Sequence, residues 1–402
     1  MSGGGTARAA APGTTPATET TLPTVTEATP AQLVEWDALT VDPPGGHLYQ
    51  SRAWAAYRAA IGWRPRFLAL SDGGRVLVLE RPWPIVGGAS AYVSRGPAPT
   101  SLPVATLAAR LAAVSDYLAA HGVDVVAADA EVPAETGYGE LLAARGFRPI
   151  EELQPSRHRM DLVLGPGADE AAVFRAFSMS HRQRIRQAER EGLVVLRLDR
   201  VAPAGEGEAL AGGALAGPGA GCVGPSDDPF DSAEAVIGRL HALVRLTGER
   251  RHFSVGPADA FLDWSLRALA ARRLVLLECR TAEGEPLAAA SFYRHGERLT
   301  YSHSGDRTEL RSAHPGAVRL ILWRLIQLAI AEGRAIVDLG GVDVAGARRM
   351  PRPGEPAHGL LEFKRGFGAS WVELTGARER VVRPARYAIG RVTARASRVV
   401  GR

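Results

Sequence analysis

Lys364 is the only lysine in this chain, and the rest of its 48 basic residues are arginines. Lysine carries a compact charge on a flexible stem and changes its pKa on burial, whereas arginine is a planar fork that stays charged. The surrounding segment 361–368, LEFKRGFG, mixes apolar and cationic residues with two glycines. We therefore expect a chemical role for the Lys364 amine; the alternative is a single lysine codon at a surface position.

Length and composition limit the class of protein. The 402 residues exceed one ordinary core and predict two domains of a soluble, globular protein. A net charge of +5 and a pI of about 9.5 permit an anionic partner without requiring one. Cys222 and Cys279 have no metal-ligand spacing, so we expect a cytoplasmic setting with no metal and no other cofactor. No secretion signal is visible, and the longest apolar stretch, 320–331, is too short to span a bilayer.

The two halves of the chain repeat one order of predicted elements. Each half contains two strands, a loop, a helix that a glycine ends, and an apolar strand that ends at an aspartate. Tyr92 and Tyr301 are separated by the same offset as Asp129 and Asp338. The repeat predicts two α/β units, each with a helix packed on a mixed sheet, and a ligand cleft between them. The predicted segments are 75–80, 89–93, 104–120 and 123–128 in the first half and 287–293, 299–302, 316–331 and 335–337 in the second.

The repeat continues downstream and bears on Lys364. The segment GELLAARGF at 139–147 resembles GLLEFKRGF at 359–367. When the two are aligned on Arg-Gly-Phe, Lys364 faces Ala144. A scaffold that works with alanine in one copy does not need the cation, which favours a chemical role for Lys364.

A general base is less clearly indicated. Asp338 ends a strand beside the predicted cleft, but its first-half counterpart Asp129 suggests a structural role such as capping. His303 could titrate near neutral pH, although a hydrogen-bonded structural histidine is the favoured interpretation.

The tandem units suggest two acetyltransferase-like (GNAT) domains with mixed sheets, joined by the basic helix 174–191. The segment 202–229 is rich in Ala, Gly and Pro and is expected to be a flexible insertion. The last segment carries many arginines and could lie along tRNA or an anionic membrane face, although a solvated helix is the default. The predicted boundaries are 1–30 for a disordered tail, 31–160 for the first domain, 161–376 for the second and 377–402 for a basic C-terminal tail.

Coenzyme A is an unfavoured ligand. An acetyltransferase holds the pyrophosphate on free backbone N–H groups of a glycine-rich turn at a helix start. The corresponding segments here, 311–317 and 100–103, lack that glycine pattern, and each contains a proline without an N–H.

Motifs in the right order resemble the Fem family (FemABX-like) of aminoacyl-tRNA-dependent peptidyltransferases, which build cross-bridges on peptidoglycan precursors. The resemblance covers 50–376, although Arg58 stands where many relatives have a lysine, and no coiled-coil arm is visible. The matching pieces are Gln50-Ser51-x-x-Trp54-x-x-x-Arg58 with Gly62-Trp63, Tyr92-x-x-Arg95-Gly96-Pro97, Gly146-Phe147-Arg148, Asp161-Leu162, Arg182-x-x-Ile185-Arg186-x-Ala188-Glu189-Arg190-x-Gly192, Thr247-x-x-Arg250, Tyr301-x-x-Ser304-Gly305, Asp338-x-Gly340-Gly341 and Phe363-Lys364-x-Gly366-Phe367-Gly368.

The resemblance implies a reaction and a set of site residues. The donor is the aminoacyl ester of a tRNA, and the acceptor is an amine on a stem peptide. Lys364 is the candidate catalytic residue, stabilising the negative charge that develops on the ester oxygen; it could instead bind a substrate carboxylate or the tRNA terminus. The expected substrate-binding residues are Arg58, Arg95, Arg250, Tyr301 and Phe363. The expected tRNA-binding residues are Arg182, Arg184, Arg186 and Arg190, for which a merely solvated helix face is the alternative.

The sequence therefore predicts a cytoplasmic transferase that adds an amino acid, with glycine favoured, to lipid II or UDP-MurNAc-pentapeptide. Its partners would be aminoacyl-tRNA and that precursor, with peripheral contact to the inner face of the membrane left open. The alternatives are a Fem-like ligase of natural-product biosynthesis, a CoA-dependent N-acyltransferase, and a non-enzymatic RNA-binding protein. The amino acid, the acceptor and the oligomeric state stay open.

Overall fold

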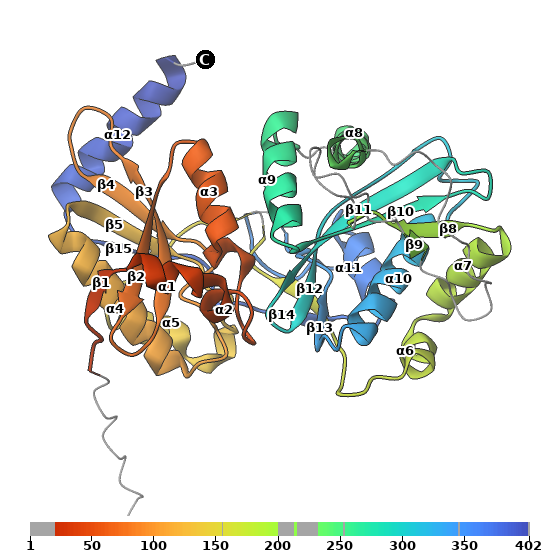
Figure 1. Cartoon of the computed structure of the whole chain (residues 1–402), viewed down its shortest axis with the longest axis horizontal. Helices are drawn as coiled ribbons and strands as arrows, with labels where there is room; N and C mark the ends of the chain where they lie inside the picture. The colour runs from red at the N-terminus through yellow and green to blue at the C-terminus, as the bar shows by residue number, and fades with distance from the viewer. Residues whose placement is uncertain are drawn as a thin grey trace, which may run out of the picture.

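The computed structural model describes residues 21–154, 156–199, 213–214, 232–251, 254–344 and 346–400. They form two domains side by side, each a mixed sheet with helices packed on it (Figure 1). The predicted class, two tandem α/β domains with mixed sheets, is confirmed. The predicted insertion 202–229 lies outside the described residues except for 213–214, and so do residues 1–20 of the predicted N-terminal tail.

The first sheet has seven strands, and its neighbours run antiparallel except for one parallel pair in the middle, β4 with β5. In spatial order its strands are β1 (Val25–Glu27), β2 (Arg64–Leu70), β3 (Arg75–Pro82), β4 (Ala89–Val93), β5 (Val123–Ala128), β15 (Arg378–Val381) and β6 (Arg148–Pro149).

The second sheet has eight described strands and the same pattern, with β12 and β13 as its parallel pair. In spatial order its strands are β14 (Ser370–Val372), β7 (Arg159–Val163), β13 (Ile336–Asp338), β12 (Arg298–Asp306), β11 (Pro286–His295), β10 (Leu274–Arg280), β8 (Val194–Arg197) and β9 (Gly213–Ala214).

The two domains exchange one strand each. After β6, the chain leaves the first sheet, and β7 pairs between β13 and β14 of the second. After β14, the chain returns, and β15 pairs between β5 and β6 of the first. The predicted tail from 377 therefore contains a strand of the first sheet, and residues 25–27 of the predicted N-terminal tail pair with β2. The domain boundaries consequently differ from those expected from the sequence at both ends, because the exchanged strands carry no local signal of their partners.

Helices cover both faces of each sheet. Among the described residues they are α1 (Pro30–Val34), α2 (Trp36–Thr40), α3 (Arg52–Ala60), α4 (Val104–Ala120), α5 (Tyr138–Ala143), α6 (Glu170–Ala176), α7 (Met179–Arg190), α8 (Ala233–Arg251), α9 (Ala258–Ala270), α10 (Ala317–Ala331), α11 (His358–Arg365) and α12 (Pro384–Val400), with short 3-10 turns at Leu48–Gln50 and Ala134–Thr136. The predicted basic helix 174–191 is thus two helices, α6 and α7.

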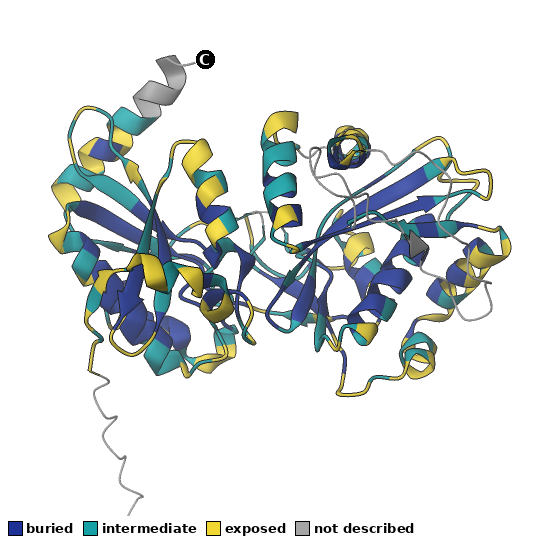
Figure 2. Ribbon diagram, viewed as in Figure 1, coloured by how far each residue is buried: buried dark blue, intermediate teal, exposed yellow. Residues whose placement is uncertain are grey.

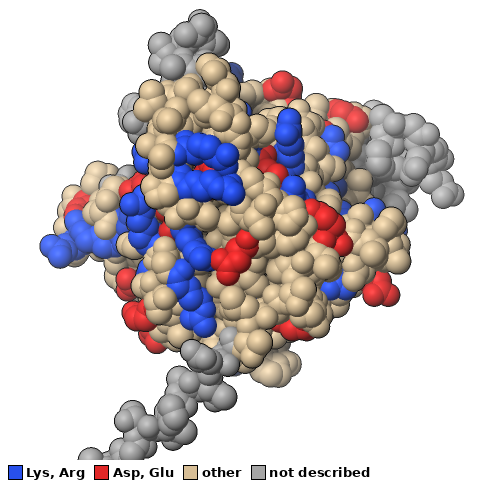
Figure 3. Space-filling view, turned by 90° about the vertical axis from the view of Figure 1, so that its left-hand side faces the viewer, with Lys and Arg blue, Asp and Glu red and all other residues tan. Residues whose placement is uncertain are grey.

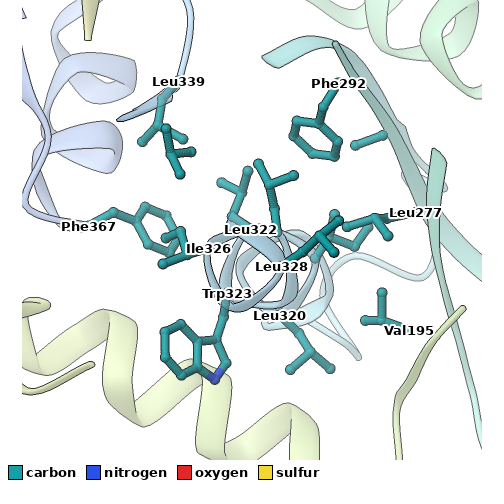
Figure 4. Packing of buried hydrophobic residues seen from close by; sticks show 14 of the residues in the cluster. Val195, Leu277, Phe292, Leu320, Leu322, Trp323, Ile326, Leu328, Leu339 and Phe367 are labelled. Carbon is teal, nitrogen blue, oxygen red and sulfur yellow. The ribbon is translucent and has the colours of Figure 1, made fainter. Parts of the chain in front are cut away.

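Helices bury both faces of the second sheet, with α10 on one face and α8 and α9 on the other (Figures 2 and 4). Successive strand side chains point to opposite faces. In β10, Val275 and Leu277 pack with α10, whereas Leu274 and Leu276 pack with residues of α8 and α9. Because α10 is apolar on nearly every side, it becomes the centre of a core that also includes Phe292, Trp323 and Phe367.

The internal repeat holds for the order of elements, but Tyr92 and Tyr301, which align in the sequence, do not occupy equivalent places relative to Asp129 and Asp338. The ladder sets Val93 opposite Ala128, one step before Asp129, but sets Thr300 opposite Asp338. Tyr301 therefore stands further along its strand than Tyr92 does. The Tyr92 hydroxyl donates to Asp129 at 2.7 Å, whereas the Tyr301 hydroxyl pairs with Ser304.

Candidate active site

A pocket of about 780 Å³ opens in the second domain and contains Lys364. Its walls come from α8, β12, the segment leading into α10, the loop after β13, and α11. Of its lining residues, Ser156 alone comes from the stretch that leads out of the first domain. The ligand cleft expected between the two repeated units is thus a pocket within the second one.

The Lys364 ammonium is buried and held by the backbone. The residue is 6% exposed, and its Nζ donates to the carbonyl oxygens of Gly340 and Gly341, each at 2.9 Å. Burial lowers the pKa of Lys364 to about 8, and the nearby Asp338 opposes that shift. The amine is therefore positioned for use as a cation at neutral pH, and it can lose its proton more readily than an exposed lysine.

Contacts on two sides fix the loop at Gly340 and Gly341, whose carbonyls bind the Lys364 ammonium. Asp338, the last residue of β13, accepts a hydrogen bond from the Gly340 N–H at 2.7 Å. Burial, reinforced by the neighbouring Asp161 carboxylate, raises the pKa of Asp338 to about 6. At Gly341 a Cβ would lie within 2.6 Å of Ser156 side-chain atoms and the His158 carbonyl, so only glycine lets this loop pass beneath Lys364.

Among the described residues, six cations and one carboxylate, that of Asp306, line the pocket. Arg250 of α8 is partly neutralised, because its Nη2 donates to Asp306 at 2.7 Å. Arg307 pairs with Glu285 and Glu309 outside the pocket. The lining cations are Arg250, Arg251, Arg307, Arg311, Arg319 and Lys364.

Arg319 is a partly buried arginine of this lining that has no carboxylate beside it among the described residues. Its Nη1 donates to the Pro315 carbonyl at 3.1 Å, and its Nε is buried without a hydrogen-bond partner. Burial lowers the pKa of Arg319, and the charges of Arg184 and Arg311 lower it further. Arg311 and Arg319 were not among the site residues predicted from the sequence, since the turn 311–317 stood out only for lacking the glycines that coenzyme A needs.

The predicted tRNA-binding helix lies beside this pocket. In α7 the exposed face carries Arg184, Arg186 and Arg190, whereas Arg182 is half-buried and donates to the carbonyls of Arg175 and Phe177. The opposite face is anchored by His181, whose Nε2 lies 2.9 Å from the Phe363 carbonyl. Burial, with Arg319 nearby, lowers the pKa of His181 to about 4, so the ring is neutral at pH 7. The helix α7 is thereby tied to α11, which carries Lys364.

Two more predicted residues lie in the pocket. Phe363 lines the wall under the Arg319 guanidinium, whose carbon is 5.1 Å from the ring centre. The centre of the Tyr301 ring is 6.0 Å from the Lys364 Nζ. His303 also lines the pocket; burial lowers its pKa to about 4, so it is a weak base. The structure thus brings together Lys364, Phe363, Tyr301 and Arg250.

Arg58 and Arg95 lie elsewhere. Arg58 lies on α3, with its guanidinium carbon 5.3 Å and 4.7 Å from the ring centres of Trp54 and Trp63, and burial lowers its pKa. Arg95 is largely but not fully buried, and its guanidinium lies 3.6 Å from Asp129 and 3.6 Å from Glu131. Burial alone would lower the pKa of Arg95, but the two carboxylates raise it above its usual value. The two carboxylates compensate the positive charge of Arg95, so its surroundings favour a structural role over the binding of an anionic substrate.

Arg95 belongs to a buried ionic network that joins the two domains. Glu131 of the first domain accepts from Arg159 of the exchanged strand β7 at 3.0 Å. Arg159 also donates to Asp161 at 2.9 Å, and Asp161 in turn raises the pKa of Asp338. Burial alone would raise the pKa of Glu131, but Arg95, with other cations around it, holds it well below the usual value. A continuous set of charges therefore connects the interface to the loop that holds Lys364.

Neither a metal site nor a bilayer-spanning helix is found in the part of the chain that the structure describes. No cluster of His, Cys, Asp and Glu there could hold a metal ion. No described helix combines the length and the hydropathy needed to cross a membrane.

Comparison with known proteins identifies the fold. Residues 223–364 match the family model described as "Acetyltransferase (GNAT) domain". A crystal structure described as FemX superposes with a TM-score of 0.69, covering 91% of this chain and 99% of that one, at 17% sequence identity. The chain has the FemX fold. The resemblance to the Fem family noted in the sequence is therefore confirmed at the level of the fold.

A more distant structure shares the FemX fold. A conserved protein of unknown function from Bacteroides thetaiotaomicron VPI-5482 superposes with a TM-score of 0.50 at 10% identity, covering 89% of this chain and 99% of that one. No curated protein sequence matches the chain. The family model and the FemX fold together support an enzyme that transfers acyl groups.

Proposed function

We propose that the protein is an aminoacyl-tRNA-dependent transferase that adds an amino acid, with glycine favoured, to the stem peptide of a peptidoglycan precursor. The observation that carries the proposal is the Lys364 ammonium, held by two carbonyls inside a pocket whose walls are basic. The FemX fold and the ordered motifs of the sequence support the same assignment.

The proposed chemistry is aminolysis of an ester. The acceptor amine attacks the carbonyl carbon of the aminoacyl ester, and negative charge develops on the carbonyl oxygen. The bond from that carbon to the ribose oxygen then breaks, and the ribose oxygen leaves as a hydroxyl by taking up the proton that the amine loses, directly or through water. A fixed cation near that oxygen lowers the barrier by about 3–4 kcal/mol. Lys364 can supply it without rearrangement, because the two carbonyls already fix its position. Phe363 and Tyr301 form apolar walls beside it, and they would exclude water that hydrolyses the ester.

The basic surroundings suit a polyanionic donor. Arg184 on α7 and the pocket arginines Arg311 and Arg319 would contact phosphates near the tRNA terminus. Arg250 and Tyr301 remain candidates for the acceptor, and Arg58 a candidate at the interface of the two domains. Whether the acceptor is lipid II or UDP-MurNAc-pentapeptide is part of the test.

The CoA-dependent alternative is not favoured. At the start of α10, the N–H groups of His314 and Ala317 already donate to the carbonyls of Leu310 and His314, and Pro315 has no N–H. Three positions of the turn 311–317 therefore offer a pyrophosphate no free backbone donor.

A transfer assay read by mass spectrometry tests the proposal. Purified protein receives a charged total tRNA pool and either UDP-MurNAc-pentapeptide or lipid II. Parallel reactions contain Lys364→Met protein, ribonuclease, or acetyl-CoA in place of tRNA, and Arg365→Met serves as the matched basic control on α11. A mass gain of one amino-acid residue that ribonuclease and Lys364→Met abolish is the expected result. A gain of an acetyl group, or transfer that survives ribonuclease, would overturn it; no gain on either acceptor would favour the natural-product alternative.

A further inference from the structure

An apolar surface bordered by arginines lies at one end of the first domain, where the hairpin between β3 and β4 meets α12 (Figure 1). Ile85 at the hairpin tip is 93% exposed. On α12, Ile389 and Val392 are 51% and 67% exposed. Isolated apolar residues on a surface are ordinary, but three large aliphatic side chains on two adjoining elements are not.

The hairpin and α12 are fixed against each other. A Cβ at Gly390 would lie 2.4 Å from the Trp83 ring, so the helix rests directly on that indole. The Trp83 Nε1 donates to Asp124 at 2.9 Å, and Arg386 of α12 donates to the same carboxyl group at 2.6 Å. This contact uses the face of α12 that carries Gly390 and Arg386.

The faces of α12 that do not contact Trp83 differ in polarity. At 100° per residue, Ala385, Ala388, Ile389 and Val392 form an exposed apolar stripe away from Trp83. Arg391 lies on the flank of that stripe and is exposed. The surface is therefore amphipathic with its apolar side toward solvent, the reverse of a helix that serves only a protein core.

The charge on these two elements has one sign. Residues 81–90 and 384–400 together contain five arginines and no Asp or Glu: Arg81, Arg386, Arg391, Arg395 and Arg398. Figure 3 looks onto this domain, where Arg groups gather below an uncharged area of the surface. A helix with an apolar face and arginine flanks binds in the interfacial plane of a bilayer and favours anionic lipids.

We propose that the exposed apolar stripe of α12, which includes Ile389 and Val392 and is flanked by Arg391, docks the protein on a bilayer that carries anionic phospholipids. The apolar side chains enter the headgroup boundary, and Arg391 contacts the lipid phosphates. The surface lies on the first domain, away from the pocket of the second, so docking leaves the pocket open. The inference does not depend on which acyl group the protein transfers.

Vesicle co-sedimentation of the full chain tests this surface. The vesicles contain phosphatidylcholine alone or phosphatidylcholine with phosphatidylglycerol, and the variants are Ile389→Asp/Val392→Asp and Arg391→Glu. The matched control is Val34→Asp on α1, where the valine is 75% exposed in the same domain but outside this surface. Circular dichroism confirms that each variant is folded.

The expected result is binding to the anionic vesicles that weakens with added salt. Reversing the charge at Arg391 should weaken it about thirtyfold, the double aspartate variant should abolish it, and Val34→Asp should bind as the unaltered protein does. Binding that the double variant keeps would overturn the proposal. The proposal would also be wrong if these substitutions left vesicle binding unchanged and altered only the gel shift of uncharged tRNA, because the surface would then bind RNA. It would be wrong too if they altered only the molecular mass measured by light scattering, because the surface would then bind a second copy of the chain.

Discussion

At the scale of the residue, Lys364 keeps a charge where burial disfavours one. Its pKa of about 8 lies below that of an exposed lysine, so burying the ammonium reduces stability below pH 8, and this reduction disappears as the pH rises beyond it. A residue kept under such conditions serves a purpose other than holding the fold.

Replacing Lys364 by methionine separates these roles. We expect kcat/KM to fall about 100- to 1000-fold. The free energy of unfolding should stay within about 1 kcal/mol or increase at pH 7, because removing the buried charge offsets the loss of two hydrogen bonds. Transfer kinetics and urea unfolding measure the two quantities, with Arg365→Met as the control. A loss of several kcal/mol in stability would instead mark Lys364 as structural.

The ionisation of Lys364 also predicts a pH profile. If the ammonium acts as the cation, kcat/KM should fall as the pH rises through about 8. The Asp338 carboxylate raises the pKa of Lys364, so Asp338→Asn should move this fall to lower pH. The Asn side chain can still accept from the Gly340 N–H, which keeps the loop in place. A profile that rises through pH 9 in both proteins would contradict the role.

At the scale of the element, α7 and the start of α10 form one basic face beside the pocket. Arg319→Gln should weaken binding of aminoacyl-tRNA and reduce the slope of log K against log salt by about one. Arg64→Gln, an exposed arginine on β2 of the first domain, should leave both unchanged. Fluorescence anisotropy across a salt series measures the effect. Equal slopes for all three proteins would remove Arg319 from the tRNA site.

Sequence patterns predicted the helices and strands better than they predicted which strands pair and which side chains meet. The apolar spacing of α10 and the glycine after it were enough to place that helix, and the ordered motifs were enough for the FemX fold. The pocket was only partly predictable: Lys364 stood out by its rarity, but Arg319 is one arginine among many until the structure shows it without a carboxylate. Arg95 looked available for the same reason, since nothing in the sequence places it between Asp129 and Glu131.

At the scale of the whole molecule, the exchanged strands make the two domains one folding unit. Ending the chain after Gly376 removes β15, which exposes the edges of β5 and β6. We expect this truncation to lose the cooperative unfolding transition of both domains, because Arg159 of β7 and Glu131 link their cores. A truncation after Ala394, which keeps β15, should unfold in one transition. Calorimetry that finds an independently folded second domain in the shorter chain would contradict this linkage.

The strand exchange also has a consequence for how the protein is made. The edge of β5 receives its partner only when Arg378 meets Ala128, so a ribosome must synthesise almost the whole chain first. After Ala128 is made, the residues up to Arg378 take roughly 10 to 50 s at elongation rates of about 5–20 residues per second. During that time the nascent first domain presents an open strand edge to its surroundings. Chaperone protection of nascent chains, rather than the stability of the finished fold, should therefore limit the yield of this protein in cells.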